Sequence, residues 1–301
     1  MKVNTDNLIN QFRQFLIVER NASPHTVNQY VADLQQFNLF LSKEVISHFN
    51  AVTHSDIRLY LTELYNAGLS RVSASRKLSS LRTFYYYLEK ESIVEHNPIE
   101  YVSMPKRDKK IPQFFYAEEL ERLFNVEDCS QPLGQRNQAL IEILYATGIR
   151  VSELVQIKLT DIDYTLSTIL VHGKGNKERY VPFGAYAQTA VKEYIEDGRK
   201  ELISKSKEEI DQLFVNFRGT PLTDEGVRYI LNDMMKRAAL TSSIHPHKLR
   251  HTFATHLLNE GADMRSVQEM LGHESLSSTQ IYTHVTKDYL QNIYKNAHPR
   301  A

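Results

Sequence analysis

The chain carries, between residues 150 and 282, a set of side chains whose types fit an attack on a phosphodiester without a metal: Arg150, Lys174, His247, Arg250, His273 and Tyr282. A tyrosine hydroxyl, with an ordinary pKa of about 10, must lose its proton as it attacks phosphorus. Two arginines offer permanently charged donors to the nonbridging oxygens of the transition state. Histidine exchanges protons near neutral pH, and lysine can protonate the departing alkoxide. As a set, these residues predict metal-free phosphoryl transfer.

Each member has an ordinary structural explanation when it is taken alone. Glu153 can hold the guanidinium of Arg150 in a structural pair, although an arginine in the first turn of a helix opposes the helix dipole and favours a nearby anion. Lys174 can be an exposed turn residue. Tyr282 is one of 17 tyrosines, and a tyrosine is far more often a half-buried hydrogen-bonding residue than a nucleophile. The prediction therefore depends on the combination.

The histidines also permit a metal site. His247 and His251 have the four-residue separation that zinc sites use on a helix. The glutamate of the H-E-x-x-H pattern is missing, however, and Lys248 and Arg250 place positive charge where the cation would sit. We therefore expect no metal and no other cofactor, with a metal-dependent hydrolase as the competing interpretation.

Local patterns predict the elements that position the set. The segment ILYATGIRVSELVQI favours an apolar helix that ends near Gly148 and a second helix that begins around Arg150. β-branched residues on both sides of a Gly-Lys-Gly-Asn turn predict a β-hairpin over residues 167–183, with Lys174 at its tip. The turn lacks the Walker pattern and leads into a strand, so we expect no nucleotide site there.

Two more predicted helices follow toward the C-terminus. The segment HPHKLRHTFATHLL favours a helix that buries one face, formed by Leu249, Phe253 and Leu257. An adjacent polar face should carry His247, Arg250 and His251. Gly272 should end the next helix, so that His273 falls just beyond its terminus. Ser277 or Ser278 can cap a short helix that carries Tyr282.

The first hundred residues predict helices, because apolar residues recur there at three- and four-residue steps and no strand pattern interrupts them. The third is expected over about Ser55 to Ala67, and the fourth from about Ser73. The fourth should bury Leu78, Leu81, Tyr85 and Leu88, and should present on its opposite face Arg76, Ser80, Thr83 and Tyr87. The segment from Ser70 to Thr83 has several cations and no carboxylate, which suits phosphates; a merely solvated basic face is the alternative.

Composition indicates two domains and little about partners. The 301 residues are 42% hydrophobic, and 36 basic residues balance 36 acidic ones, so net charge alone does not predict a polyanion partner. A basic run bounded by prolines, MPKRDKKIP, predicts a linker over 105–112 between domains 1–104 and 113–301. The single cysteine, Cys129, excludes an internal disulfide and fits a reducing cytoplasm. We expect no leader sequence and no membrane insertion.

The motifs TGIRVSEL, GKGNKER, HPHKLRHTFATHLL, LGHESLSSTQIYTHV and AHPRA together resemble those of tyrosine site-specific recombinases of the phage integrase family. The resemblance covers essentially the whole chain, including SPHTVNQYVADLQQF near the N-terminus. It implies a mainly α fold: an N-terminal helical core-binding domain of the SAM-like, four-helix type, and a mostly helical catalytic domain with a small antiparallel β-sheet.

The resemblance also implies a role for each member of the set. Arg150 and Arg250 would bind the scissile phosphate, and Lys174 would be the general acid toward the 5′ hydroxyl. The histidines of the set would assist proton transfer and hold the phosphate. Tyr282 would form a 3′-phosphotyrosyl bond, whose retained energy allows resealing without ATP.

The partner implied by the resemblance is double-stranded DNA with a specific recombination site, clamped between the two domains. Its phosphates would meet the cations of the fourth helix and of the linker, and this helix is our candidate for base reading in the major groove. These cations are Arg71, Arg76, Lys77, Arg82, Lys106 and Arg107. The resemblance further implies a second, related recombinase in a heterotetramer and a septal DNA translocase, which together resolve chromosome dimers at cell division.

The segment after Tyr282 has Thr286 as a candidate cap and Leu290, Ile293 and Tyr294 as an apolar stripe. By itself it can pack on its own domain, whereas the resemblance implies docking on a neighbouring protomer. Besides the metal-dependent hydrolase, three alternatives stay open at this point: a type IB topoisomerase, a mobile-element integrase, and a DNA-binding module without catalysis.

Overall fold

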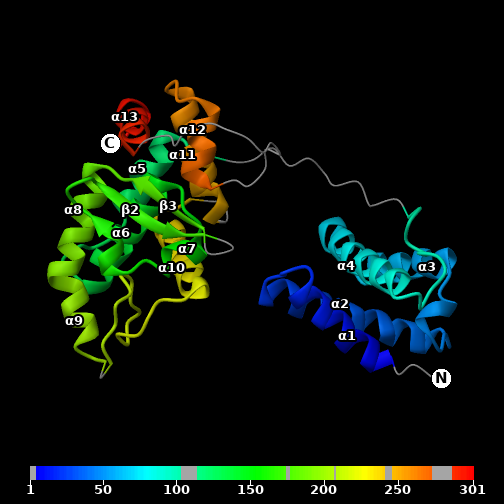
Figure 1. The fold of residues 1–301 in the computed structure, drawn as a ribbon. Coiled ribbons are helices and arrows are strands. Elements are labelled where there is room, and N and C mark those ends of the chain that lie inside the picture. The colour runs from blue at the N-terminus through cyan, green and yellow to red at the C-terminus, as the bar shows by residue number, and fades with distance from the viewer. Residues whose placement is uncertain (1–4, 103–113, 174–176, 207, 241–245, 273–286) are drawn as a thin grey trace. The chain divides into compact units, whose positions relative to one another are not determined.

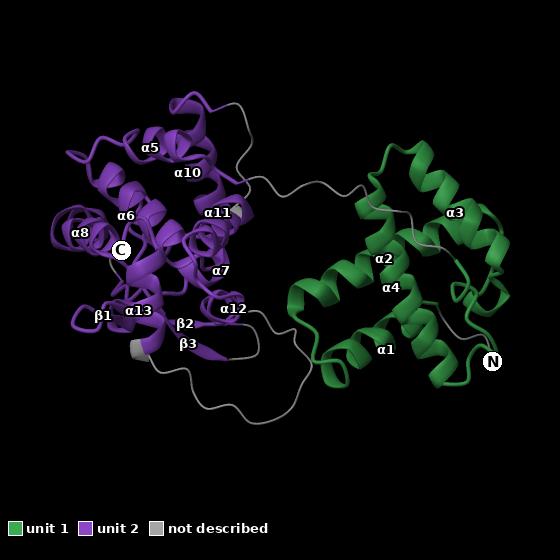
Figure 2. Cartoon of the chain, turned by 90° about the horizontal axis from the view of Figure 1, so that it is seen from above, with its two compact units in different colours: residues 1–110 green, residues 111–301 purple. Residues whose placement is uncertain are grey.

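The computed structural model describes residues 5–102, 114–173, 177–206, 208–240, 246–272 and 287–301. The chain divides into two compact units, residues 1–110 and 111–301 (Figure 2). The predicted linker cations Lys106 and Arg107 lie outside the described residues. Within the described ranges, no helix combines the length and the apolar character needed to cross a bilayer.

Between residues 5 and 102, the described part of the first unit, there are four α-helices, in agreement with the predicted helical domain (Figure 1). They are α1 (Thr5–Val18), α2 (Pro24–Lys43), α3 (His54–Asn66) and α4 (Arg71–Lys90), with a 3₁₀ turn, η1, at Phe49–Ala51. Each of the last three begins at a side-chain cap: Ser23, Thr53 and Ser70 accept bonds from backbone N–H groups of the first turn. The caps Thr53 and Ser70 start α3 and α4 slightly earlier than the apolar pattern alone predicted.

The core of the first unit is aromatic. Phe12, Phe37 and Phe84 are fully buried, and their rings contact neighbouring rings at centroid distances of 4.8–6.4 Å. Phe12 and Phe15 of α1 also pack on Tyr87 of α4. The helix α4 is therefore covered on more than one side.

The second unit is mostly helical around one central helix. Nearly every residue of this helix, α6, is buried from Ala139 to Thr147, and it packs against α5, α8 and α11. The helices and helical turns described in this unit are α5 (Ala117–Phe124), α6 (Pro132–Thr147), α7 (Val151–Leu154), η2 (Leu159–Asp161), α8 (Ala185–Glu193), the π-helical turn η3 (Tyr194–Gly198), α9 (Arg199–Ile203), α10 (Asp224–Arg237), α11 (Pro246–Asn259), α12 (Met264–Leu271) and α13 (Lys287–Ala297).

A three-stranded antiparallel sheet completes the second unit, with strand order β1 (Ile162–Asp163), β2 (Thr168–His172) and β3 (Glu178–Pro182). The register pairs Ile169 with Val181 and Val171 with Arg179, and the three apolar members of these pairs are buried. The predicted β-hairpin and the predicted fold class are thus confirmed. Residues 174–176 at the tip, including Lys174, lie outside the described residues.

The C-terminal helix α13 covers its own unit. Leu290, Tyr294 and Ala297 form one apolar cluster with residues of α11 and α12, and Figure 1 shows α13 beside these helices. The predicted apolar stripe is confirmed, and in the single chain it packs on its own unit. Docking of this segment on a neighbouring protomer, which the resemblance implied, stays a prediction.

The residues after α13 also hold the C-terminal tail, residues 287–301, on the second unit. The ring of His298 lies 4.7 Å from that of Tyr294 and 4.9 Å from that of Tyr145. Arg300 forms an ion pair with the buried Glu142 of α6, and its guanidinium lies 4.2 Å from the centroid of Phe124. Burial lowers the pKa of His298 to about 3, so the ring is neutral in the docked tail at physiological pH.

We expect acid to loosen the tail. When the segment 287–301 opens, His298 regains its ordinary pKa of 6.5 and takes up a proton that the docked state excludes, so docking weakens as the pH falls below 6.5. One unit below that value the penalty is about 1.4 kcal/mol, or about tenfold more opening. Hydrogen exchange of the segment at pH 7.5 and 5.5, corrected for intrinsic rates, measures this change.

His298→Phe is the matched control, because it keeps an aromatic ring and cannot bind the proton. The extra opening at pH 5.5 should disappear in this variant. If it persists at full size, the responsible group is another one, such as His256, whose pKa is also lowered by burial and which contacts Tyr145.

Candidate active site

Arg150 lies at the turn between α6 and α7. Gly148 ends α6 in the left-handed conformation (φ +59°), and a Cβ there would clash with the ring of Phe253 on α11. Arg150 then becomes the N-cap of α7. Its backbone N–H donates to Oε2 of Glu153 and its Nη1 donates to Oε1, both at 2.8 Å. The predicted pairing with Glu153 is confirmed, and the Arg150 side chain stays 38% exposed.

Arg250 approaches the same place from α11 and is only 8% exposed. Among the described residues its partners are backbone carbonyls: it donates to Gly148 O at 2.7 Å and to Leu271 O at 2.6 Å. Burial and the nearby positive charges of Arg150 and Arg179 lower its pKa to about 10. The guanidinium therefore remains charged at neutral pH, but without a carboxylate to offset its burial in these contacts.

A third guanidinium, that of Arg179 on β3, completes the cluster, although Arg179 is not among the residues predicted from the sequence. Its Nη1 and Nη2 donate to Oε1 and Oε2 of Glu153 at 3.1 and 2.9 Å, and its Nε donates to Met270 O at 2.9 Å. The sequence did contain a signal for Arg179. It lies two residues before Val181 in the predicted strand, so the two side chains share a strand face, and the apolar Val181 marks that face as buried.

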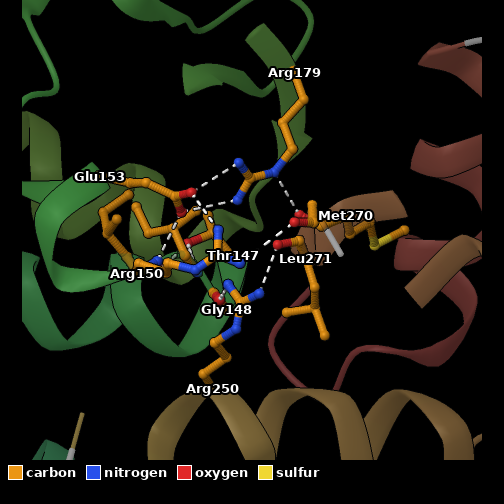
Figure 3. A network of polar contacts seen from close by, with 11 residues as sticks. Thr147, Gly148, Arg150, Glu153, Arg179, Arg250, Met270 and Leu271 are labelled. Atoms are coloured by element: carbon orange, nitrogen blue, oxygen red, sulfur yellow. Dashed lines mark hydrogen bonds and ion pairs between the residues drawn. The ribbon is translucent and has the colours of Figure 1, made fainter. Parts of the chain in front are cut away.

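The three arginines converge on one carboxylate and one helix end, as Figure 3 shows. The last carbonyls of α12 accept in order from Arg179 (Met270 O), Arg250 (Leu271 O) and Arg150 (Gly272 O, 3.4 Å). These are carbonyls that a helix terminus leaves unsatisfied. Three positive charges against the single charge of Glu153 leave the site positive, as an anion site requires.

Glu153 is the buried counter-charge of the cluster, with 4% exposure. Burial works to raise the pKa of its carboxyl group. Hydrogen bonds from Arg179 and from the backbone of Arg150, together with the charges of both arginines, outweigh burial and lower that pKa below its ordinary value. Glu153 is therefore ionised at neutral pH.

The helix α11 differs in part from the prediction. Leu249, Phe253 and Leu257 are fully buried as expected. His247 and Arg250 do not share one surface face, since His247 is exposed whereas Arg250 is buried beneath the turn at Gly148. Gly272 ends α12 with a φ of +64°, as predicted. Other members of the predicted set and their neighbours lie outside the described residues: Lys174, His273, Ser277, Ser278, Tyr282 and Thr286.

The prediction that α4 exposes a polar face is wrong for part of that face. Ser80 is fully buried, and Tyr87 is covered by α1. Ser80 is buried because it donates a hydrogen bond to Asp33 of α2, which is only 1% exposed. Asp33 also accepts hydrogen bonds from Arg76 and Lys77 of α4. Lys77 is thereby buried and Arg76 half-buried.

The remaining predicted cations of α4 differ in exposure. Arg71 lies exposed in the first turn of the helix. Arg82 is partly buried and donates to Val102 O at 3.1 Å. The basic character of α4 at the surface is thus concentrated toward its N-terminal end, where Arg71 is exposed and Arg76 is partly exposed.

Comparison with known proteins matches both units. Residues 113–288 match the Phage integrase family, and residues 9–92 match the Phage integrase, N-terminal SAM-like domain. The chain is 57% identical to the tyrosine recombinase XerC of Oceanobacillus iheyensis over 293 residues, which cover 97% of this chain and 96% of that protein. It is 53% identical to the tyrosine recombinase XerC of Bacillus subtilis over 298 residues, 99% of this chain and 98% of that protein.

Among solved structures, the chain is similar to the XerH site-specific recombinase bound to a palindromic difH substrate in a post-cleavage complex. The TM-score is 0.71 at 26% identity, and the match covers 95% of this chain and 80% of that one.

Removal of the central carboxylate should destabilise the second unit. We expect Glu153→Gln to lower its free energy of unfolding by about 3 kcal/mol at pH 7, because buried guanidinium groups lose their counter-charge. Since the pKa of Glu153 is lowered in the folded state, its contribution is present above the ordinary value of 4.5 and is lost as the pH falls through the folded-state pKa. The difference between variant and wild type should therefore shrink in acid.

Hydrogen exchange of β3 and α6 peptides along a urea series, at pH 7 and at pH 3.5, measures this difference in the second unit alone. Glu121→Gln, at an exposed position of α5, serves as the control and should change nothing. An effect of Glu153→Gln that is equally large at both pH values would contradict an ionic role for Glu153.

Proposed function

Because this chain belongs to the phage integrase family and is a XerC-like tyrosine recombinase that cleaves and rejoins DNA, we propose that Arg150 and Arg250 of its arginine cluster hold the scissile phosphate while Tyr282 attacks it. The observation that carries this proposal is the convergence of Arg150, Arg250 and Arg179 around Glu153, which leaves a fixed excess of positive charge. Fixed donors of this kind stabilise charge that develops in a transition state.

The two arginines of the predicted set suit different parts of that task. Arg150 spends one nitrogen on Glu153 and remains 38% exposed, so it can turn further N–H donors toward a phosphate. Arg250 is buried between the carbonyls of Gly148 and Leu271, so its charge acts from a fixed position behind Arg150. A bound phosphate supplies the negative charge that these guanidinium groups lack.

The proposed reaction is one exchange of bonds and its reversal. The oxygen of Tyr282 forms a bond to phosphorus, the bond from phosphorus to the 5′ oxygen breaks, and that oxygen takes a proton from Lys174. His247 and His273 assist in accepting the proton that the tyrosine releases. A 5′ hydroxyl of another strand then attacks the phosphorus of the 3′-phosphotyrosyl bond and gives up its proton. The bond from phosphorus to the tyrosine oxygen breaks, the tyrosine regains a proton, and the DNA is resealed without ATP or a metal.

In the first unit we propose that Arg71, Arg76 and Arg82 contact phosphates of the duplex, together with Lys106 and Arg107 of the linker. Lys77 has a different place, since it is buried against Asp33 and Gln36. We assign it to holding α4 on α2, and through Asp33 to orienting Arg76.

The biological reaction that we propose is resolution of chromosome dimers at cell division, in the cytoplasm. There the protein would act on a specific recombination site in a heterotetramer with a XerD-like recombinase and under a septal DNA translocase. Support comes from the similarity to proteins named tyrosine recombinase XerC, which extends over both units and nearly the full length of each chain.

Covalent trapping tests the proposal. With a nicked suicide substrate that carries the recombination site, we expect a protein–DNA adduct that survives denaturant and forms in EDTA. Tyr282→Phe should abolish the adduct and leave DNA binding intact, because only the attacking oxygen is removed. Denaturing gel electrophoresis with end-labelled DNA measures it.

Each alternative gives another result. Loss of cleavage with chelator would favour a metal-dependent hydrolase, and tight binding without an adduct on any substrate would favour a non-catalytic DNA-binding module. Relaxation of supercoiled DNA without a defined site would favour a type IB topoisomerase. Sequencing of the DNA trapped in cells separates a chromosomal site from a mobile element.

Loss of a phosphate-binding arginine should slow chemistry more than it weakens binding. We expect Arg150→Ala to reduce the single-turnover cleavage rate at saturating substrate by about 100-fold, close to the ~3 kcal/mol of one oxyanion donor, because the interaction strengthens in the transition state. Its affinity for the site should change far less.

The matched control is Arg71→Ala, which removes an exposed arginine of the first unit. This variant should bind the site more weakly, with a smaller salt dependence, and should cleave at the wild-type rate once saturated. A fall in affinity as large as the fall in rate for Arg150→Ala would contradict the assignment of Arg150.

A further inference from the structure

Arg179 lies where the segments that carry the proposed catalytic residues meet, although it is not a member of the predicted set. Its side chain is 15% exposed. It belongs to β3, binds both oxygens of Glu153 beside Arg150, and donates from Nε to Met270 O at the end of α12. One planar group thus joins the hairpin, the α7 turn and α12.

The same guanidinium lies close to two glycines of the site. A Cβ added to Gly272 would lie 3.1 Å from Cζ of Arg179, which is tighter than ordinary contact, and a Cβ added to Gly173 would lie 3.6 Å from its Nη1, at ordinary van der Waals distance. Gly272 directly precedes His273, and Gly173 directly precedes Lys174. The arginine therefore lies near the backbone immediately before each of these two proposed catalytic residues, with little room for a side chain at Gly272.

The contacts of Arg179 differ from those of a phosphate ligand. Both of its terminal nitrogens and its Nε are engaged by Glu153 and by Met270 O, and its side chain is less than half as exposed as that of Arg150. Its plane is fixed by the two parallel bonds to the carboxylate. A donor group held in this way orients its neighbours more readily than it turns toward a substrate.

We propose that Arg179 is a positioning residue for strand cleavage, which holds the β2–β3 hairpin in the place from which Lys174 protonates the leaving 5′ oxygen. This inference rests on the proposed function, since it takes the general-acid role of Lys174 as its premise. A misplacement of about 1 Å in a reacting group costs up to about 100-fold in rate. The bonds from Arg179 to the Glu153 carboxylate fix β3, which pairs with β2 as far as His172, and so prevent such a displacement at the root of the hairpin tip.

Arginine is required here for its shape. Its rigid fork of donors reaches Glu153 on one side and Met270 O on another, whereas a lysine ammonium is a point charge that cannot make this planar pair of bonds. Arg179→Lys therefore preserves the charge of the cluster and removes the geometry. A defect in this variant is a defect of position and not of net charge.

The test compares two leaving groups. In one suicide substrate the scissile linkage has its natural 5′ oxygen, and in the other that oxygen is replaced by sulfur, which leaves as a thiolate without a proton from Lys174. We expect Arg179→Lys to form the covalent adduct about 100-fold more slowly than wild type on the oxygen substrate. On the sulfur substrate its rate should return close to that of wild type.

Three further variants serve as references for the result with Arg179→Lys. Lys174→Ala should show the same rescue by sulfur, Arg150→Ala should be slow on both substrates, and Arg228→Lys, at an exposed position of α10, should match wild type on both. Hydrogen exchange of β3 and α12 verifies that the second unit is folded. Arg179→Gln is a second variant at the same position and should behave as Arg179→Lys does.

Different failures are distinguishable. If wild type forms no adduct with either substrate, the proposed function is wrong. If Lys174→Ala is rescued by sulfur while both folded Arg179 variants remain slow on both substrates, the positioning role is overturned. Wild-type rates for the Arg179 variants on the oxygen substrate overturn it as well.

Discussion

The structure of the site depends on how three guanidinium groups are kept together despite their mutual repulsion. The C-terminal end of α12 offers the carbonyls of Met270, Leu271 and Gly272, and each accepts from a different arginine. These carbonyls also carry the negative end of the helix dipole, which favours cations. Together with Glu153, they offset part of the positive charge of the cluster. Burial, and after it the charges of Arg150 and Arg179, still lower the pKa of Arg250.

This constraint explains why the elements around the site are short and end in tight turns. The helix α7 has a single turn, and both α6 and α12 stop at glycines with positive φ, so that carbonyls of the two helix ends face the same arginine of α11. Leu249 and Phe253 bury the other side of α11, so Arg250 cannot withdraw from these carbonyls. The core therefore sets the position of the charges.

Sequence patterns predicted those parts of the molecule that depend on neighbours along the chain. Helix periodicity, the hairpin, Gly148 and Gly272 are local signals, and so is Glu153 three residues after Arg150. The contacts that were missed join distant segments: Asp33 with Lys77, Arg179 with Met270, and Arg300 with Glu142. A strand register or a helix crossing decides such contacts, and neither can be read from a local pattern. For the same reason α4 was predicted to expose a face that Asp33 and α1 cover.

The two buried carboxylates illustrate how a chain with no net charge can present fixed positive charge to a polyanion. Asp33 is shared by Arg76 and Lys77, and Glu153 by Arg150 and Arg179, so each carboxylate orders two cations and neutralises only one. The surplus charge stays at a defined position, whereas an exposed lysine carries its charge on a flexible side chain. Acidic residues elsewhere in the sequence cancel this surplus in the total net charge. Local pairing, and not overall composition, thus determines where a phosphate can bind.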